Sequence, residues 1–232
     1  MKFETLRELN AERAARRPAI VVTDTQTGEQ RLVKARDFAA DPLRVELSRQ
    51  LRMGKSGTIE ANDRKLFLNV YAPTARMVIV GAVHISQALA PLARSLDYDV
   101  TVVDPRTAIA SPERFPDVPL IAEWPDVALP PLNIDHYTAF VALTHDPKID
   151  DPALLHAFER DCFYIGALGS RKTHAKRAER LKAQGAKDGD IERIHAPIGL
   201  SIGAVSPSEI AVAIMAEITA QLRLPREKEA AA

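Results

Sequence analysis

The sequence predicts an α/β protein that is built on an open parallel sheet and preceded by a small α+β N-terminal domain. Residues 77–80 form a continuous apolar run, as expected for a parallel strand that helices cover on both faces. Gly81 follows where the chain must turn, and apolar residues then recur at helical spacing over 85–96. A second strand is predicted over 100–103, and Asp104 follows at its carboxyl end, where a dinucleotide fold places its ribose-binding acid. This order predicts a Rossmann-like βαβ unit.

The glycine-rich turn that normally holds a pyrophosphate is degenerate in this unit. Against the pattern G-x-G-x-x-G, residues 81–86 keep only Gly81, and the β-branched Val83 stands at the second glycine. The helix start predicted at about Ile85 still offers free N–H groups and a positive dipole end to an anion. Two interpretations stay open, namely a βαβ unit that only packs and a ligand site unlike an ordinary NAD site.

Composition excludes several classes of protein. The 232 residues include 31 Lys and Arg and 31 Asp and Glu, so the net charge is zero and no global field recruits nucleic acid or an acidic membrane. One cysteine excludes an intramolecular disulfide and a Cys₂ or Cys₄ metal site. The charged amino terminus has no apolar signal region, and no later stretch approaches the length of a membrane span. We therefore expect a cytoplasmic protein.

Residues 1–72 are expected to form the small α+β domain. Hydrophobic spacing predicts a helix that Pro18 ends, then two strands, a helix that starts at Asp41 and Pro42, and a hairpin. The predicted elements are helix 3–15, strands 19–23 and 30–35, helix 41–51, and strands 58–60 and 65–71.

Residues 73–224 are expected to form the Rossmann-like domain, with 225–232 as a frayed tail. Six prolines between Pro112 and Pro131 predict a loop-rich crossover, in which we expect Trp124 to anchor the loop on the core. A capping box at Ser206 and Glu209 starts the closing helix. The remaining predicted elements are strand 138–143, helix 151–161, strand 163–168, the strongly basic helix 172–183, and the closing helix through Leu222.

Polar groups gather at the predicted carboxyl ends of these strands, where open parallel sheets bind ligands. Gly169, Ser170 and Arg171 offer backbone N–H groups, a hydroxyl and a guanidinium to a phosphate. The alternative is a tight turn in which Arg171 binds a local carboxylate. The residues that we expect to form a binding cleft are Gly81, Val83, His84, Asp104, Arg106, Thr144, His145, Asp146, Gly166, Gly169, Ser170 and Arg171.

Catalytic and metal-binding constellations are not evident in the sequence. His145 and Asp146 could act as base and orienter, but no nucleophile is paired with them, and a buried, hydrogen-bonded histidine is the commoner outcome. His84 and His145 on separate loops are a weak metal signal. We interpret Cys162 as a small buried hydrophobe, and the basic side of helix 172–183 as a solvated face.

Several of these stretches together resemble the XdhC/CoxI family of accessory proteins for molybdenum hydroxylases. The likeness runs in order through most of residues 75–224 and is weaker over 1–72. It is carried by residues 81–84 with 87–92, then 100–104, 144–146, 164–171, 197–200 with 202–204, and 209–211.

The resemblance implies a protein that transiently binds molybdenum cofactor, as molybdopterin or its dinucleotide, and has no turnover of its own. It also implies delivery to the molybdenum-containing subunit of xanthine dehydrogenase or CO dehydrogenase, support of sulfuration with a cysteine desulfurase, and a homodimer. Members often carry an N-terminal cysteine, which this chain lacks there, and a second glycine where it has Val83. Two alternatives stay open, an NAD(P)-dependent oxidoreductase and an adaptor that binds the partners but no cofactor.

Overall fold

The computed structural model describes residues 1–61 and 63–224. The chain divides into two compact units, the first built from Met1–Pro73 and the second from Thr74–Leu222. The expected tail, 225–232, lies outside the described residues, as does Asn62. Across the described ranges, no helix combines the length and the apolar character that a membrane span requires.

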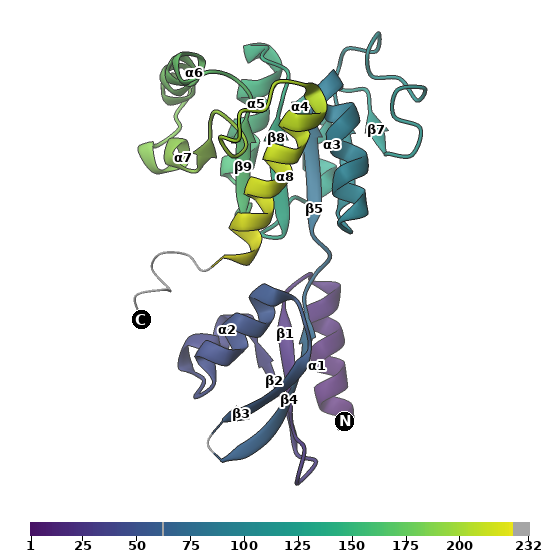
Figure 1. Ribbon diagram of the computed structural model, residues 1–232, viewed down its shortest axis with the longest axis vertical. Coiled ribbons are helices and arrows are strands. Elements are labelled where there is room, and N and C mark those ends of the chain that lie inside the picture. The colour runs from purple at the N-terminus through teal and green to yellow at the C-terminus, as the bar shows by residue number, and fades with distance from the viewer. Residues whose placement is uncertain (62, 225–232) are drawn as a thin grey trace. The chain divides into compact units, whose positions relative to one another are not determined.

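The first unit is an antiparallel sheet of order β2-β1-β4-β3 with helices on both of its faces (Figure 1). Leu47 of α2 packs on the core of one face, while Leu9 of α1 packs on Ala19 and Val21 on the other. Strand β1 is therefore almost wholly buried. The elements are α1 (Phe3–Ala14), β1 (Ala19–Asp24), β2 (Gln30–Lys34), the 3-10 helix η1 (Ala35–Ala40), α2 (Arg44–Met53), β3 (Gly57–Ala61) and β4 (Arg64–Tyr71).

The start predicted for α2 at Asp41 and Pro42 is early. Residues Ala35–Ala40 already form η1, and the Asp41 carboxylate accepts a hydrogen bond from the Leu43 N–H (2.9 Å) and pairs with Arg31. These contacts hold the chain in a turn, so the α-helix begins at Arg44.

The second unit is the predicted Rossmann-like domain, an all-parallel sheet of order β10-β9-β8-β5-β6-β7. Every residue of β8 and β9 is buried, which explains their continuous apolar runs. The strands are β5 (Arg76–Val80), β6 (Asp99–Val103), β7 (Leu120–Ile121), β8 (Thr138–Ala142), β9 (Tyr164–Ala167) and β10 (Ile194–His195).

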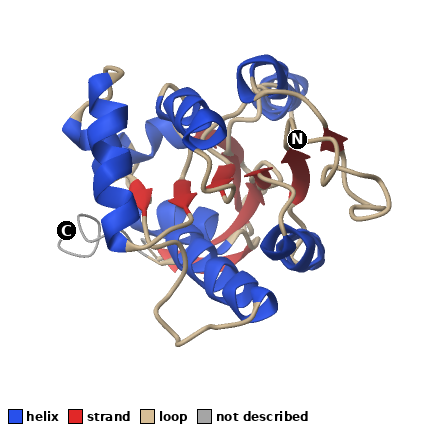
Figure 2. Cartoon of the chain, turned by 90° about the horizontal axis from the view of Figure 1, so that it is seen from above, coloured by secondary structure: helices blue, strands red, loops and turns tan. Residues whose placement is uncertain are grey.

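Helices cover both faces of this sheet, as Figure 2 shows from above. Helices α3 and α8 bury Leu89 and Ile214 in the core of one face, whereas α5 and α6 bury Leu154 and Leu181 in the other. The α3 stripe differs from prediction at one end, since Leu96 at the C-cap is half exposed. The helices are α3 (His84–Ser95), α4 (Pro125–Ala128), η2 (Pro130–Leu132), α5 (Pro147–Phe158), α6 (Arg171–Ala183), α7 (Asp188–Glu192) and α8 (Pro207–Arg223).

The proline-rich crossover carries β7, α4 and η2, but the expected role of Trp124 is wrong. Trp124 is 49% exposed, and it is the N-cap residue of α4. Pro125, directly after it, is buried instead. A proline at the first helical position fixes the turn by itself, so no aromatic anchor is needed there.

A polar cluster joins the edge of the sheet to α8, and the sequence did not predict it. The Tyr164 hydroxyl donates to Glu217 Oε2 (2.5 Å), which also accepts from the Gly199 N–H (2.8 Å). His195 Nδ1 lies 3.2 Å from Glu217 Oε1, and its ring stacks on Tyr164 at 4.6 Å. Burial and the bond to this carboxylate raise the pKa of Tyr164. Glu217 thus fastens β9, β10 and the loop after β10 to the closing helix.

Candidate functional site

The carboxyl ends of the strands meet at one edge of the second unit, and the order of the sheet makes this edge a switch point. From β5 the chain continues to β6 on one side and reaches β8 on the other. Ligands of open α/β sheets bind in the crevice at such a point. The predicted site residues follow β5, β6, β8 and β9, except Gly166, which lies within β9, so the topology brings all four groups to this edge.

Gly81 and Thr144 pack together where the two halves of the sheet separate. Gly81 has a φ of +121°, and a Cβ there would lie 2.9 Å from Thr144 Cγ2 and 3.2 Å from the Thr144 nitrogen. Only glycine tolerates both this backbone conformation and this approach. Gly81, which the sequence places in the binding cleft, therefore has a structural role that is independent of any ligand contact.

The α3 N-terminus, just after Gly81, has no side-chain cap. Its N-cap residue is Val83, which has no group that could accept from the first N–H donors of the helix. The helices that follow β8 and β9 differ, because Asp146 accepts from Lys148 N–H at the start of α5 and Ser170 accepts from Thr173 N–H at the start of α6. The uncapped α3 terminus is therefore the one among these three that keeps its donors for an anion.

Asp104 is fully buried, and neighbours within the chain occupy both of its carboxylate oxygens. Oδ2 accepts from the Ala82 N–H and Arg106 Nη2, both at 2.7 Å, and Oδ1 accepts from the Arg106 N–H and Nε, both at 2.9 Å. Burial alone would raise the pKa of Asp104, but these bonds outweigh it and lower the pKa. Asp104 thus holds the Ala82 turn, which leaves no free oxygen for a ribose, and its contact with a ligand stays a prediction.

Thr144, His145 and Asp146 form a turn around a carboxylate that sequence reasoning missed. Asp150 in the first turn of α5 accepts from Thr144 Oγ1 (2.6 Å) and from the His145 N–H (3.1 Å). These bonds hold His145 at a φ of +63° with an exposed side chain, so the expectation of a buried histidine is wrong. The helix also begins four residues before the predicted Asp151, because Asp146 caps it and Pro147 takes the first position.

Arg177 of α6 is the second residue that sequence reasoning missed. We expected the basic side of this helix to be solvated, but the Arg177 side chain is 2% exposed and lies 3.6 Å from Asp150. Its Nη2 donates to the Leu168 carbonyl at the end of β9 (2.8 Å). An arginine in a basic helix gives no sequence signal that separates a buried position from an exposed one.

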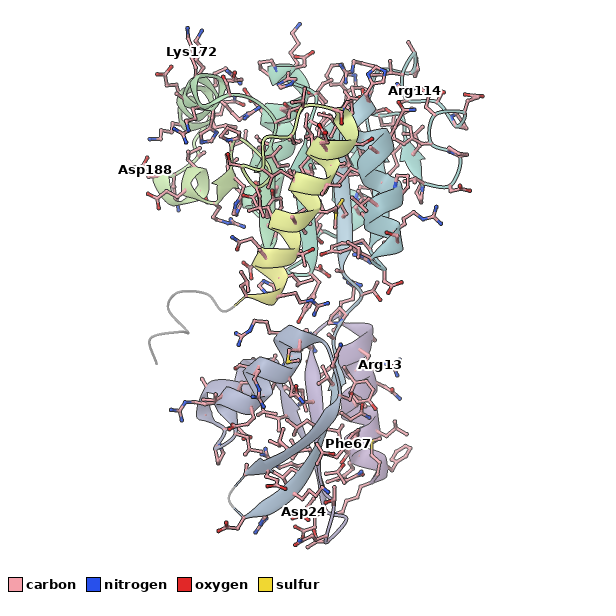
Figure 3. All side chains as sticks on the ribbon, viewed as in Figure 1. Arg13, Asp24, Phe67, Arg114, Lys172 and Asp188 are labelled. Atoms are coloured by element: carbon pink, nitrogen blue, oxygen red, sulfur yellow. The ribbon has the colours of Figure 1, made fainter. Side chains whose placement is uncertain are left out.

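Arg114, labelled in Figure 3, ties the loop after β6 to the Gly81 turn. It donates to the Ala82 carbonyl (2.9 Å), to the Ile109 carbonyl (2.8 Å) and to Gln87 Oε1 (2.7 Å). This arginine fixes the backbone that leads into α3, although no motif predicted it.

The remaining predicted residues lie at this edge of the sheet, where some are buried and others are exposed. A Cβ on Gly166 would lie 2.5 Å from Ile198 Cδ1, so this glycine permits close packing. Gly169 has a φ of +131° before Ser170, the α6 cap, and Arg171 is exposed at the first position of α6. Whether these residues bind a ligand stays a prediction.

Metal ligands and a reactive thiol find no support in the geometry. His84 is exposed, and the part of the chain that the structure describes contains no group of three or more His, Cys, Asp or Glu side chains that could hold a metal ion. Burial raises the pKa of Cys162 to about 12, which agrees with an inert, buried thiol.

Comparison with protein families identifies a match over most of the second unit. A model described as the XdhC Rossmann domain matches residues 77–218, which include all strands of the second unit except the first residue of β5. In Escherichia coli, the molybdenum cofactor insertion chaperone PaoD is 31% identical over 159 residues, which are 68% of this chain and 43% of that protein. In Bacillus subtilis, a probable subunit of xanthine dehydrogenase is 32% identical over 154 residues, 66% of this chain and 44% of that protein.

Two further proteins are similar to this chain. An uncharacterized protein of Escherichia coli, YqeB, is 32% identical over 155 residues, 66% of this chain and 28% of that protein. A crystal structure from Bacillus halodurans, described as a xanthine dehydrogenase, matches the fold with a TM-score of 0.66 and 24% identity over 97% of this chain and 65% of that one. The chain matches less than half the length of the three curated relatives.

Proposed function

Because the chain belongs to the XdhC family, we propose that it is an accessory protein that binds molybdenum cofactor and supports its insertion into a molybdenum hydroxylase. The observation that carries the proposal is the uncapped α3 N-terminus at the switch point of a domain that is similar to a molybdenum cofactor insertion chaperone. The cofactor is the cargo of such a protein, which needs a site that holds an anion and later releases it. No turnover is required of the chain itself.

The residues at the α3 terminus suit the phosphate of a pterin cofactor. The unused N–H donors and the dipole of a 12-residue helix attract an anion without a fixed positive side chain. Val83 covers part of this turn and packs on the core, so a phosphate would bind at the first turn of α3 rather than against the residue 83 backbone. A site of this kind binds a charged group moderately and keeps it exchangeable.

The proposed partner is the molybdenum-containing subunit of an enzyme of the xanthine dehydrogenase or CO dehydrogenase type. One relative is named as a probable subunit of xanthine dehydrogenase, which supports the first type. A cysteine desulfurase as a second partner, and a homodimer, belong to the same proposal through the family resemblance.

The NAD(P)-dependent alternative is disfavoured by the surroundings of Asp104. A ribose-binding acid needs a free carboxylate oxygen, and both oxygens of Asp104 are occupied by Ala82 and Arg106. The adaptor alternative, with no bound cofactor, is one outcome of the following test.

The test is to load the purified chain with molybdenum cofactor and measure both retained pterin and its transfer to a cofactor-free molybdenum hydroxylase. We compare the native chain with Val83→Asp and Val83→Asn. Both substitutions supply an N-cap that stabilises α3, but only the aspartate repels an anion. We expect Val83→Asp to lower retention about 10-fold and Val83→Asn about 3-fold, and the melting temperature of each variant is measured alongside as a control for folding.

Equal retention in all three proteins would indicate that the cofactor does not bind at the α3 N-terminus. If the native chain retains no pterin but still binds the hydroxylase in a pull-down, the cofactor-binding proposal fails and the adaptor alternative replaces it.

A further inference from the structure

A cavity of about 180 Å³ opens beside the β8–α5 turn, against the first turns of α6. Charged side chains dominate its lining, and none of them comes from the α3 terminus. The charged and ionisable residues that line it are His145, Asp150, Lys172, Lys176, Arg177 and Arg180.

Positive charge exceeds negative charge in this cavity. Arg180 is already paired with Asp151, through Nε at 2.6 Å and Nη2 at 3.0 Å. Lys172, labelled in Figure 3, and Lys176 are exposed, and neither has an ion pair among the residues that the structure describes. The two lysines therefore keep their charge available to a ligand.

Arg177 forms the inner wall and has more donors than partners. Its side chain is 2% exposed, and while Nη2 reaches the Leu168 carbonyl, neither Nε nor Nη1 has a hydrogen-bond partner within the described chain. Asp150 does not supply one, because its oxygens accept from Thr144 and His145 and its nearest approach to Arg177 is 3.6 Å. Burying a guanidinium with two unbonded nitrogens costs free energy of folding unless an acceptor forms hydrogen bonds with them.

We propose that this cavity is a phosphate-binding site in which Lys172 and Lys176 bind the anion from the open side and a small rotation of the buried Arg177 guanidinium brings its unused donors to the anion. The planar fork of arginine matches two oxygens of a phosphate, and the flexible lysines add charge without fixed geometry. His145 also lines the cavity, and its exposed side chain offers a further ring nitrogen. The site does not rest on the proposed function, because its lining shares no residue with the α3 terminus.

The ligand chemistry is a phosphate dianion, either free or as a monoester of a larger molecule. The mouth of the cavity is open, so an ester group can extend from it. Calorimetric titration of the full chain with inorganic phosphate, and in parallel with adenosine 5′-monophosphate, separates the two sources. Tighter binding of the ester by about 10-fold identifies a monoester site, while equal affinity identifies a site for free phosphate.

The deciding variant is Lys172→Gln/Lys176→Gln, because both side chains are exposed and the fold does not depend on them. We expect inorganic phosphate to bind this protein about 10-fold more weakly than it binds the native chain. The matched control is Lys182→Gln, which removes one charge from the same helix at an exposed residue that pairs with Asp188 outside the cavity. It should change the affinity less than about 2-fold, as a distant screened charge does.

Three results would overturn the proposal. The first is no saturable phosphate binding to the native chain up to about 10 mM, a weaker affinity than a built site provides. The second is an equal loss in the double variant and in Lys182→Gln, which would indicate only general attraction to a basic helix. The third is a larger loss in Arg171→Gln than in the double variant, which would place the anion at the turn before α6. Arg177→Met adds a check on the inner wall, provided that its circular dichroism matches the native spectrum.

Discussion

The β6 end and the β8 end of the sheet each hold a fully buried aspartate beside an arginine, but only the first pair is complete. Asp104 receives two bonds from the side chain of Arg106 and two from backbone N–H groups. Asp150 receives its bonds from Thr144 and His145, and Arg177 stays 3.6 Å away with two nitrogens unused. The same residue types therefore form a fully hydrogen-bonded pair at the end of β6 and leave unbonded donors at the end of β8.

The difference appears in the proton affinities of the two carboxyl groups. Burial raises the pKa of Asp150, and its hydrogen bonds and the charge of Arg177 do not offset that effect. At Asp104 the same effect of burial is outweighed by Arg106 and the backbone donors, so the pKa is lowered. Burial likewise lowers the pKa of Arg177. An opposite charge nearby is thus not sufficient; the number and length of the bonds decide whether a buried ion is compensated.

The largest effect is expected when the complete pair is broken. Arg106→Ala leaves the Asp104 charge buried with backbone donors alone, and we expect the free energy of unfolding at pH 7 to fall by about 3 kcal/mol. This is the low end for a buried pair, because the Arg106 side chain is 37% exposed and partly screened. Urea denaturation measures the loss, with Arg94→Ala on exposed α3 surface as the control. A loss of unfolding free energy below about 1 kcal/mol would indicate that the Asp104–Arg106 pair contributes no more than a surface ion pair.

A smaller effect is expected at the incomplete pair. Arg177→Met fills the buried volume and removes a poorly compensated cation, while Asp150 keeps its bonds to Thr144 and His145. We expect a loss of about 1.5 kcal/mol, roughly that of the hydrogen bond to Leu168 and part of the attraction to Asp150. The same urea experiment measures it. A loss as large as that of Arg106→Ala would show that the two pairs do not differ as described.

The smallest effect is the dependence of stability on pH, and this dependence has opposite signs for Asp104 and Asp150. A lowered pKa means that Asp104 stabilises the fold above its unfolded pKa of about 3.9, and that this contribution is lost as pH falls through the folded pKa. A raised pKa means that the contribution of Asp150 is present below about pH 3.9 and is lost as pH rises through its folded pKa.

Asp104→Asn should therefore destabilise the protein more at pH 7 than at pH 3.5, whereas Asp150→Asn should destabilise it more at pH 3.5. The sign of each difference follows from the direction in which the fold shifts the pKa of that carboxyl group. Thermal or urea unfolding of both variants across this range measures it. Parallel profiles for the two variants would contradict the comparison.

Much of the fold could be predicted because apolar runs and turn residues mark it directly. The predicted strands 77–80 and 138–143 match β5 and β8 to within one residue, and Gly81 and Asp104 lie at the strand ends where the pattern placed them. Strand β10 escaped prediction because a two-residue strand leaves no periodicity to detect.

The candidate site was less predictable because its chemistry depends on which way individual side chains face. Arg177 is spaced along α6 like its exposed neighbours, and only the position of the β9 end brings it inward. Asp150 in a first helical turn is typical of a residue that favours the helix dipole, so its bonds to the preceding turn have no separate signal. His145 was expected to be buried because that is the commoner outcome for a histidine with no paired nucleophile, but the backbone turns to a positive φ there and the side chain is exposed.

The cluster around Glu217 also bears on how quickly the second unit can reach its native state. Tyr164 and Glu217 are separated by 53 positions in the chain, and the Gly199 N–H depends on the same carboxylate. Until α8 docks, the buried hydroxyl of β9 and the loop after β10 have no acceptor, so the sheet edge cannot be completed by local contacts. Closing this long loop costs conformational entropy before any of these hydrogen bonds can form. Contacts between residues so far apart in the sequence therefore slow the folding of this domain.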